Sequence, residues 1–297
     1  MRFAPYLALL AALFLWAGNW IVARAVRDEI SPGIATVTRQ LIVIAVLLPF
    51  CFRSLFARLK GLKAHGLGIL AALAFFGGGP HLAIQWLGLH FTTATSGTLY
   101  LSISPIFILL LARPLLGEAI AARQWLGVTV SFLGVLLIAT QGEIAQFRFN
   151  PGDLMALASM LMWAAYTVFL RLRRDALDTP EFLVVLCAAG LVFMLPWVLW
   201  ESLFGTRVNL SPAGALAVLY SALGSMLLAY AGWNYAVRRL GAARAGLTMH
   251  LVPAFAVLLA AVFLGEYPGW YHGAGIALIL TGVALSGVRA SSAASSP

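Results

Sequence analysis

The sequence predicts an all-α integral membrane protein with ten transmembrane helices, arranged as two inverted five-helix repeats. Three observations support this fold class. The chain has 297 residues, of which 62% are hydrophobic and 10% charged, whereas a soluble domain is about half apolar and about a quarter charged. Apolar stretches recur along it, each about the 20 residues that a helix needs to cross a bilayer. Finally, one half of the chain repeats in the other.

The ten expected spans follow one another with short connections. The first could pass for a signal peptide, but Trp16, Asn19 and Trp20 are too polar and bulky for a cleavage region, so a retained helix is expected. The third is interrupted at Gly77-Gly78-Gly79-Pro80, because proline lacks an amide hydrogen and clashes with the preceding turn. The alternating pattern of an outer-membrane barrel is absent. The expected spans are residues 4–26, 33–52, 66–90, 93–112, 123–141, 151–171, 181–203, 211–237, 242–264 and 269–289.

The repeat is visible as matching residues at a constant offset. Trp16 and Arg24 match Trp163 and Arg171, one residue out of register with the copies downstream. We expect one five-helix repeat in residues 1–145 and the other in residues 146–297. Many secondary transporters are built from such a duplication, with the substrate site near the bilayer midplane where the repeats meet. The downstream residues Pro105, Leu116, Gly117, Glu118, Gly127 and Gly134 recur as Pro253, Leu264, Gly265, Glu266, Gly275 and Gly282.

The net charge of +9 reflects where the basic residues lie and does not indicate a nucleic-acid partner. Cytoplasmic loops of membrane proteins carry an excess of Lys and Arg. Both termini are therefore expected in the cytoplasm, and five helices per repeat would then place the repeats antiparallel across the membrane. On the expected cytoplasmic side lie Arg53, Arg58, Lys60, Lys63, Arg171, Arg173, Arg174, Arg238, Arg239 and Arg244; towards the other side lie Arg24, Arg27, Arg39, Arg148 and Arg207.

The repeated unit resembles the EamA domain of the drug/metabolite transporter superfamily, on the run from Pro105 to Gly134 and its copy from Pro253 to Gly282. The resemblance covers nearly the whole chain and has the expected helix count. It implies a secondary transporter, with no cofactor, in a bacterial inner membrane. Within the superfamily, the aromatic residues of the first helix and the Pro80-His81 pair look like bacterial exporters of aromatic amino acids.

Aromatic and polar residues share helix faces near the centres of several spans. Trp16, Asn19 and Trp20 lie at positions i, i+3 and i+4. Trp163, Tyr166 and Thr167 repeat that spacing. The same spacing recurs from Tyr230 to Asn234. Helix packing is one explanation, but polar residues on the same face favour the wall of a substrate cavity. Such a wall suits an amphipathic ligand with an apolar or aromatic side chain.

The interrupted third span carries His81 and Gln85 one turn apart, which makes both candidates for substrate contact. The glycines beside them indicate either a flexible helix next to a cavity or a kink needed only for packing. Burial among apolar residues favours the neutral imidazole, so His81 is expected to bind substrate through hydrogen bonds and not to couple a proton gradient. Tyr100 and Ser104 share a face of the fourth span and complete the candidate site.

Several chemistries are missing from the sequence. No Asp or Glu lies in the middle of a span, which argues against a carboxylate proton relay, and no Lys or Arg lies at the midplane, which argues against phosphorylated substrates. No metal-ligand spacing and no P-loop are present, and the Ala94-Thr95-Ser96-Gly97 stretch breaks the rhomboid protease pattern. We therefore expect no metal, no cofactor and no enzyme activity. Cys51 and Cys187 are expected as buried free thiols.

The leading hypothesis is a carrier that exports small amphipathic solutes, amino acids including aromatic ones, by alternating access through a central aromatic-lined cavity. A multidrug exporter of lipophilic cations is the alternative, because aromatic rings also bind cations. A passive channel is a third possibility that the sequence leaves open. The expected partners are the bilayer and a small-molecule substrate, and the protein is expected to function as a monomer.

Overall fold

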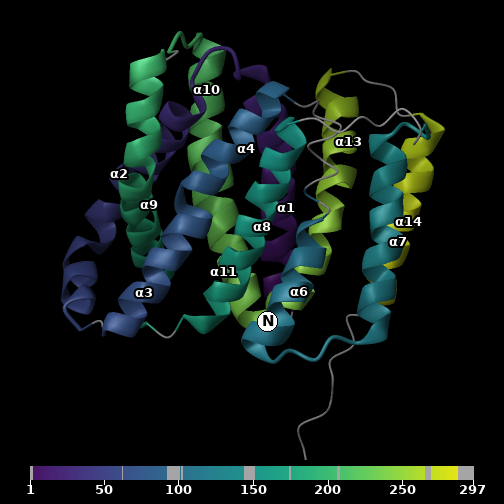
Figure 1. The fold of residues 1–297 in the computed structure, drawn as a ribbon, viewed down its shortest axis with the longest axis horizontal. Helices are drawn as coiled ribbons and strands as arrows, with labels where there is room; N and C mark the ends of the chain where they lie inside the picture. Colours follow the sequence, from purple (N-terminus) through teal and green to yellow (C-terminus); the bar gives the residue numbers. More distant parts are fainter. Residues whose placement is uncertain are drawn as a thin grey trace, which may run out of the picture.

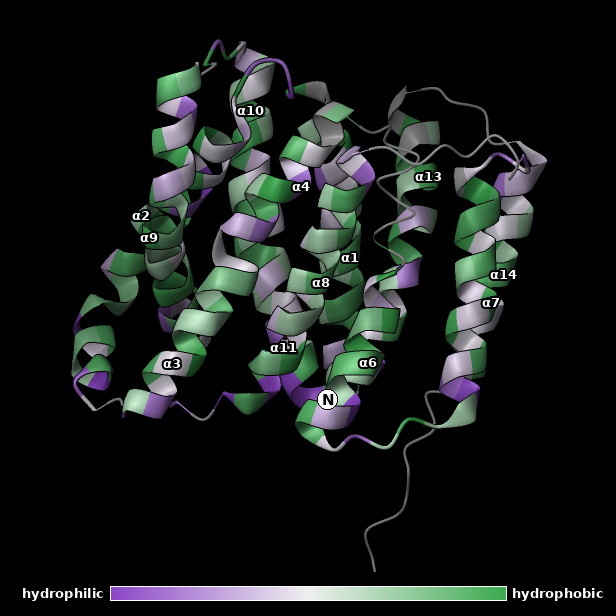
Figure 2. Ribbon diagram, viewed as in Figure 1, coloured by the Kyte–Doolittle hydropathy of each residue, from purple (hydrophilic) through white to green (hydrophobic). Residues whose placement is uncertain are grey.

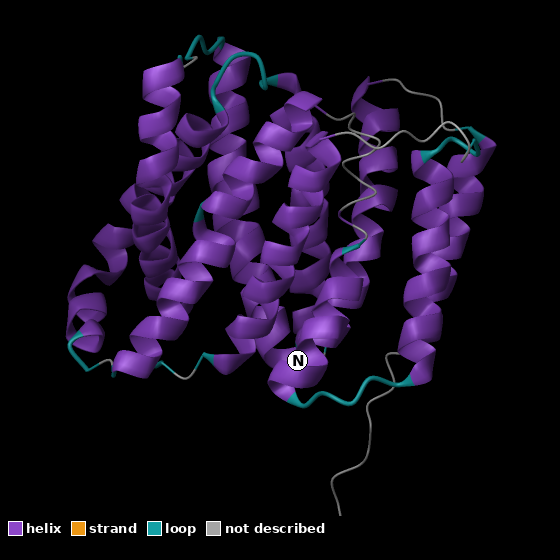
Figure 3. Cartoon of the chain, in the orientation of Figure 1, coloured by secondary structure: helices purple, strands orange, loops and turns teal. Residues whose placement is uncertain are grey.

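The computed structural model describes residues 3–61, 63–91, 101, 103–143, 151–173, 175–205, 208–264 and 269–286. Within these ranges the chain is a bundle of helices joined by short loops (Figures 1 and 3). The elements of the first half are α1 (Ala4–Ala25), α2 (Pro32–Leu59), α3 (Ala64–Leu73), η1 (Ala74–Gly78), α4 (Pro80–Phe91), α6 (Ser104–Leu116) and α7 (Ala122–Ala139). Those of the second half are α8 (Pro151–Leu172), α9 (Thr179–Phe204), α10 (Pro212–Tyr220), η3 (Ser221–Ala229), α11 (Tyr230–Leu240), α12 (Ala242–Leu247), η4 (Thr248–His250), α13 (Leu251–Leu264) and α14 (Trp270–Ser286).

These elements combine into ten spans, which confirms the fold class predicted from the sequence. Of the described helices, seven are long and apolar enough to cross a membrane, and the shorter α6, α7 and α14 are also apolar. Three spans are composite, because η1, η3 and η4 each join two α-helices into one continuous path. Large apolar side chains such as Phe50, which is 86% exposed, lie on the outside of the bundle, and Figure 2 shows hydrophobic residues along the length of the helices.

Two spans end four or more residues beyond the expected position. The second span was expected to end at residue 52, but α2 continues to Leu59, so Arg53 and Arg58 lie on the helix and not in the following loop. Cations are favoured in the last turn of a helix, where the unpaired carbonyl groups carry partial negative charge. The fourth span was expected to end at residue 112, but α6 continues to Leu116; its expected beginning falls on residues 92–100, outside the described ranges.

The predicted interruption of the third span is confirmed. Its α-helix gives way to a π-helical turn at Ala74–Gly78, and α4 starts at Pro80. A Cβ atom at Gly77 would collide with the ring of Tyr166, so only glycine allows α8 to come this close. The Tyr230 hydroxyl donates to the Gly77 carbonyl at 2.9 Å, and the Gln40 side chain donates to the Gly78 carbonyl. Neighbouring helices thus supply donors to the irregular turn, as burial in a membrane requires.

Helices α7 and α14 pack side by side along their length (Figure 1). A Cβ atom at Gly127 would meet the carbonyl of Gly282, and one at Gly134 would meet the carbonyl of Gly275. The Ser131 hydroxyl donates to the Ile279 carbonyl at 3.1 Å. In the repeat, Gly127 corresponds to Gly275 and Gly134 to Gly282. Gly127 therefore contacts the counterpart of Gly134, and Gly134 contacts the counterpart of Gly127. Contacts exchanged in this way are those of two antiparallel helices related by a two-fold axis, as inverted repeats require.

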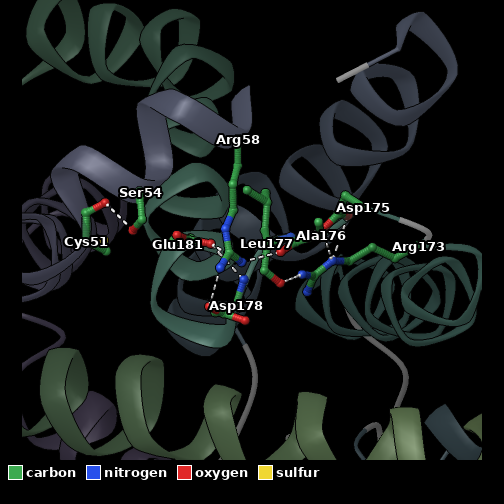
Figure 4. Close-up of polar contacts among 9 residues, drawn as sticks. All are labelled: Cys51, Ser54, Arg58, Arg173, Asp175, Ala176, Leu177, Asp178 and Glu181. Atoms are coloured by element: carbon green, nitrogen blue, oxygen red, sulfur yellow. Dashed lines mark hydrogen bonds and ion pairs between the residues drawn. The ribbon is translucent and has the colours of Figure 1, made fainter. Parts of the chain in front are cut away.

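Helices α2 and α9 are tied together at both ends. At one end, the Glu201 carboxylate accepts hydrogen bonds from the backbone of Gly33 at 2.8 Å and of Ile34 at 3.3 Å, where α2 begins. At the other end, Arg58 forms ion pairs with Asp178 at 2.9 Å and with Glu181 at 3.0 Å (Figure 4). The two helices are therefore antiparallel, like α7 and α14.

The connection from α8 to α9 is held by a second arginine. Arg173 pairs with the Asp175 carboxylate at 2.7 Å and donates to the Leu177 carbonyl (Figure 4). Its guanidinium also lies over the ring of Phe182, 4.0 Å from the ring centroid. Burial lowers the pKa of Arg173 from its ordinary value, and the Asp175 carboxylate opposes that shift. The two predicted free thiols, Cys51 and Cys187, are both buried and unpaired.

Candidate functional site

A partly open pocket with a volume of about 40 Å³ lies inside the bundle. Its wall comes from both halves of the chain: α1 and α4 from the first, and α8, η3, α11 and η4 from the second. A ligand pocket typically has a volume of about 300–1,000 Å³, so in this conformation the cavity has room for a few water molecules at most. The lining residues are Trp16, Asn19, Trp20, His81, Leu82, Gln85, Leu101, Met160, Trp163, Ser225, Tyr230 and Met249.

Aromatic rings form most of the wall and contact one another. Trp16 and Trp163, which correspond in the two repeats, lie edge to face with their ring centroids 4.9 Å apart. Tyr230 packs against both, at 6.1 Å from Trp16 and 5.4 Å from Trp163. Trp233 packs behind them, and the imidazole of His81 stacks on Trp163 at 5.6 Å. Edge-to-face and offset contacts are the preferred arrangements of aromatic rings.

The polar atoms of these rings are directed by hydrogen bonds across the bundle. The Trp16 indole donates to the Ser225 carbonyl at 3.2 Å, and the Trp163 indole donates to the Met249 sulfur at 3.2 Å. The Tyr230 hydroxyl, which donates to η1, also lies 3.5 Å from His81 Nε2. His81 Nδ1 has no hydrogen-bond partner among the described residues, so this wall has an unused polar atom.

The structure brings together six of the nine residues proposed from the sequence. Trp16, Asn19, Trp20, His81, Gln85 and Trp163 all line the cavity. Ser104 does not: it is buried behind the wall, where its hydroxyl donates to the Met249 sulfur at 3.5 Å. Tyr166 packs behind Trp163, and its hydroxyl donates to Asn234 Oδ1 at 2.7 Å. Tyr100 lies outside the described residues.

Sequence reasoning missed four polar or sulfur-containing members of the wall. Tyr230 belongs to a spacing that the sequence shows, but its helix face could not be assigned to the cavity without the neighbouring helices. Ser225, Met160 and Met249 carry no signal in the sequence. Methionine has a flexible, polarizable side chain that adapts to ligands of irregular shape, so the two methionines allow the wall to adjust.

A polar layer lies directly beside the cavity. Arg39, expected near the outer side, is 1% exposed inside the bundle. Its Nη1 donates to the Ser221 hydroxyl at 2.9 Å, and that hydroxyl donates to Oδ1 of Asn19, a cavity residue, at 2.5 Å. Its guanidinium lies over the Trp86 ring at 4.7 Å. The cavity therefore has a cation within two hydrogen bonds of its wall.

Comparison with known proteins identifies the family. The model of the EamA-like transporter family matches residues 3–140 and 150–288, one match for each half. The chain belongs to this family. It is therefore a multi-pass membrane protein of a secondary transporter family within the drug/metabolite transporter superfamily, and not an enzyme.

The relatives agree on transport and differ in how much is known of them. An uncharacterized transporter of Archaeoglobus fulgidus is 28% identical over 96% of this chain and 98% of its own length. A probable terminal-alkyne amino-acid exporter of Streptantibioticus cattleyicolor is 30% identical over 68% of this chain and 66% of its own length. A solved crystal structure has the same fold, with a TM-score of 0.77 and 20% identity over 95% of this chain and 96% of that one.

Proposed function

We propose that this transporter exports small amphipathic solutes, amino acids including aromatic ones, by alternating access through the aromatic-lined cavity. The observation that carries the proposal is the meeting of Trp16 and Trp163 at the centre, one from each repeat, in a wall that also includes His81 and Tyr230. A substrate held there contacts both repeats at once. Motion of one repeat against the other then exposes it to one side of the membrane at a time.

The small volume of the cavity fits one step of such a cycle. At about 40 Å³ the cavity is too small for an amino acid, so substrate entry requires the rings around Trp16 and Trp163 to separate. A supporting observation comes from the relative named as a probable amino-acid exporter. A free amino acid is a small solute with the mixed polar and apolar character that this wall matches.

The alternative of a lipophilic-cation exporter has the rings in its favour, because they can bind cations through their faces. The composition of the wall counts against it, since no carboxylate lines the cavity among the described residues.

A passive channel is the other alternative. A channel would pass solute without counterflow, whereas a carrier exchanges solute on one side of the membrane for solute on the other.

The decisive experiment is counterflow in proteoliposomes that contain the purified protein. Liposomes loaded with unlabelled phenylalanine are diluted into labelled phenylalanine, and uptake of label is compared with that of labelled tetraphenylphosphonium under matched conditions. Transient accumulation of phenylalanine supports the proposal. Counterflow of the cation alone would support the multidrug alternative, and flux of either solute without counterflow would indicate a channel.

We propose that His81 contacts substrate and that transport is driven by the substrate gradient. His81 is buried, stacks on Trp163 and faces the Tyr230 hydroxyl, without a carboxylate beside it among the described ion pairs. An imposed pH gradient at zero voltage tests this. Accumulation against the phenylalanine gradient that disappears in His81→Gln would overturn the proposal, and equilibration without accumulation would support it.

We propose that the protein lies in a bacterial inner membrane as a monomer with both termini in the cytoplasm. The ends of α2 and α8 that carry Arg58 and Arg171 would then face the cytoplasm. In a background without Cys51 and Cys187, an impermeant thiol reagent added outside should label Glu143→Cys and leave Lys60→Cys unlabelled. Both positions are exposed. The reverse labelling pattern would overturn this orientation.

A further inference from the structure

Arg39 is buried within a membrane-spanning helix and is not explained by the helix packing around it. It lies about 10 Å along the axis of α2 from the first residue, Pro32. Two of its neighbours are hydroxyl groups: Ser221 at 2.9 Å from Nη1 and Thr36 at 3.2 Å from Nη2. A third is the face of Trp86. Charged side chains at such depth are rare and generally mark a ligand or ion pathway.

Among the described residues, the guanidinium of Arg39 has neither a countercharge nor a full set of hydrogen-bond acceptors. None of the ion pairs among the described residues includes Arg39, and its buried Nε has no hydrogen-bond partner there. Arginine carries five N–H donors in a planar fork. Hydroxyl groups and a ring face do not neutralise the positive charge of Arg39. A bound anion would supply both the countercharge and the missing hydrogen-bond acceptors.

The site is continuous with the cavity. The Ser221 hydroxyl stands between Arg39 and Asn19, and the Asn19 side chain is part of the cavity wall. Trp86 follows Gln85, another lining residue, on α4. An anionic group that entered the enlarged cavity and took the place of Asn19 as acceptor from Ser221 would lie one hydroxyl group away from the guanidinium.

We propose that Arg39 binds the carboxylate group of the transported solute, while the rings of Trp16 and Trp163 hold its apolar part. This inference rests on the proposed function and makes it narrower: the substrate must carry an anionic group next to an apolar or aromatic one. The planar fork of arginine matches a carboxylate with two parallel hydrogen bonds. One guanidinium also balances the single charge of a carboxylate. Among the described residues, no Lys or Arg lines the cavity itself to balance the second charge of a phosphate dianion.

The same residue discriminates against lipophilic cations. A cation in the cavity would face the Arg39 charge without an intervening carboxylate among the described residues. At membrane depth, where the dielectric constant is low, such repulsion is only weakly screened. The multidrug alternative therefore predicts the opposite ligand preference from this proposal.

Three phenyl compounds of similar size separate the contributions: phenylalanine, 3-phenylpropionate, which lacks the amine, and phenethylamine, which lacks the carboxylate. Equilibrium dialysis of each labelled compound against purified protein in detergent gives the affinities. For the unmodified protein we expect both acids to bind more tightly than the amine. Equal or tighter binding of phenethylamine would overturn the role of Arg39 without any substitution.

Variants then locate the effect. Arg39→Met should weaken binding of both acids by roughly 10-fold or more, as expected for loss of a charge-assisted hydrogen bond, and should leave phenethylamine binding equal or improved. Arg39→Lys should fall between, because it keeps the charge and loses the fork. Arg123→Met removes an exposed arginine at the start of α7 and should change none of the three affinities. Unchanged binding of both acids to folded Arg39→Met would overturn the proposal.

If Arg39→Met fails to fold, a second variant still tests whether Arg39 binds the carboxylate. Ser221→Ala removes only the hydroxyl between Arg39 and Asn19, and it should change the ratio of acid to amine affinity; an unchanged ratio would count against the proposal. Binding of 3-phenylpropionate that depends on Arg39, together with no binding of phenylalanine, would support this inference and refute the amino-acid substrate.

Discussion

Helices α7 and α14 and the helices around the cavity are both places where the two repeats meet, but they meet in opposite ways. In the α7–α14 pair, Gly127 and Gly134 let the two backbones approach each other, and the Ser131 hydroxyl forms a hydrogen bond across the pair. Around the cavity, the large rings of Trp16 and Trp163 keep the helices apart and contact each other. The α7–α14 contact depends on residues with small side chains or none, whereas the contact at the cavity depends on large side chains.

The difference indicates which contact can change during transport. Close backbone packing of small residues is a principal source of helix association in membranes, where lipid is as apolar as leucine, and it tolerates little displacement. Aromatic side chains can instead rotate and slide with moderate losses per ring pair. We infer that the α7–α14 pair is the fixed part of the repeat interface and the aromatic cluster is the part that opens.

The largest effect is expected from a bulky residue in the α7–α14 contact. A Cβ atom at Gly282 would collide with the Gly127 carbonyl and the Ser131 side chain, whereas Gly273, on the same helix, has open space around it. Gly282→Leu should therefore destabilise the protein by about 3 kcal/mol or more, at or beyond the upper end of overpacking costs. Gly273→Leu is the matched control and should have almost no effect. Thermal unfolding in detergent measures both, and equal melting temperatures would contradict the fixed contact.

The next largest effect is expected on transport, from the aromatic cluster. Trp163 contacts Trp16, Tyr230 and the His81 ring, so Trp163→Ala should lower phenylalanine counterflow by roughly 10-fold or more as several ring contacts are lost together. Some loss of stability is also expected, because truncating a buried Trp costs about 3–5 kcal/mol in a soluble core. Trp163→Phe should restore a larger share of the lost stability than of the lost counterflow activity.

A matched control for that prediction is Trp270, which is 71% exposed at the start of α14. Trp270→Ala should leave counterflow by the folded protein close to that of the unmodified protein. Equal loss of counterflow in Trp163→Ala and Trp270→Ala would show that tryptophan content, and not the cavity, limits transport.

A smaller effect is expected from one hydroxyl in the aromatic wall. Tyr230→Phe keeps the ring but removes the donor to the Gly77 carbonyl in η1. Leaving that buried acceptor without its partner should cost about 1–3 kcal/mol of stability. Tyr235→Phe, at a more exposed position on the same helix, should cost less than half of that amount. A cost at Tyr230 no greater than at Tyr235 would mean that the π-helical turn does not need this bond.

The sequence predicted the elements of this fold because their signals are local. Hydropathy placed the spans, and the constant offset between glycines such as Gly127 and Gly275 revealed the repeats. An offset one residue shorter implied that Trp16 and Trp163 hold corresponding places, and the structure brings them into contact. Boundaries were less predictable, because α2 extends past its apolar run on a helix end that favours basic residues.

The candidate site was only partly predictable, because helix spacing gives a face but not what covers it. Tyr166 shares a face with Trp163, yet Asn234 on another helix draws its hydroxyl away from the cavity. Arg39 was expected towards the outer side, among the few basic residues that fall there. Its burial depends on Ser221 and Trp86, which come from distant parts of the chain, and no local pattern records that.

The smallest effect is expected at the centre of the α7–α14 contact, where Ser131 meets the residue that corresponds to it in the other repeat, Ile279. Ser131→Ala keeps the side chain small and removes only the hydrogen bond. Interhelical hydrogen bonds in membranes contribute about 0.6 kcal/mol on average, so the melting temperature should fall slightly and counterflow should not change. Thr281→Ala, which removes a hydroxyl bonded within its own helix to Ala277, is the matched control. A Ser131→Ala cost comparable to that of Gly282→Leu would mean that the polar link, and not the close approach of the backbones, holds this pair together.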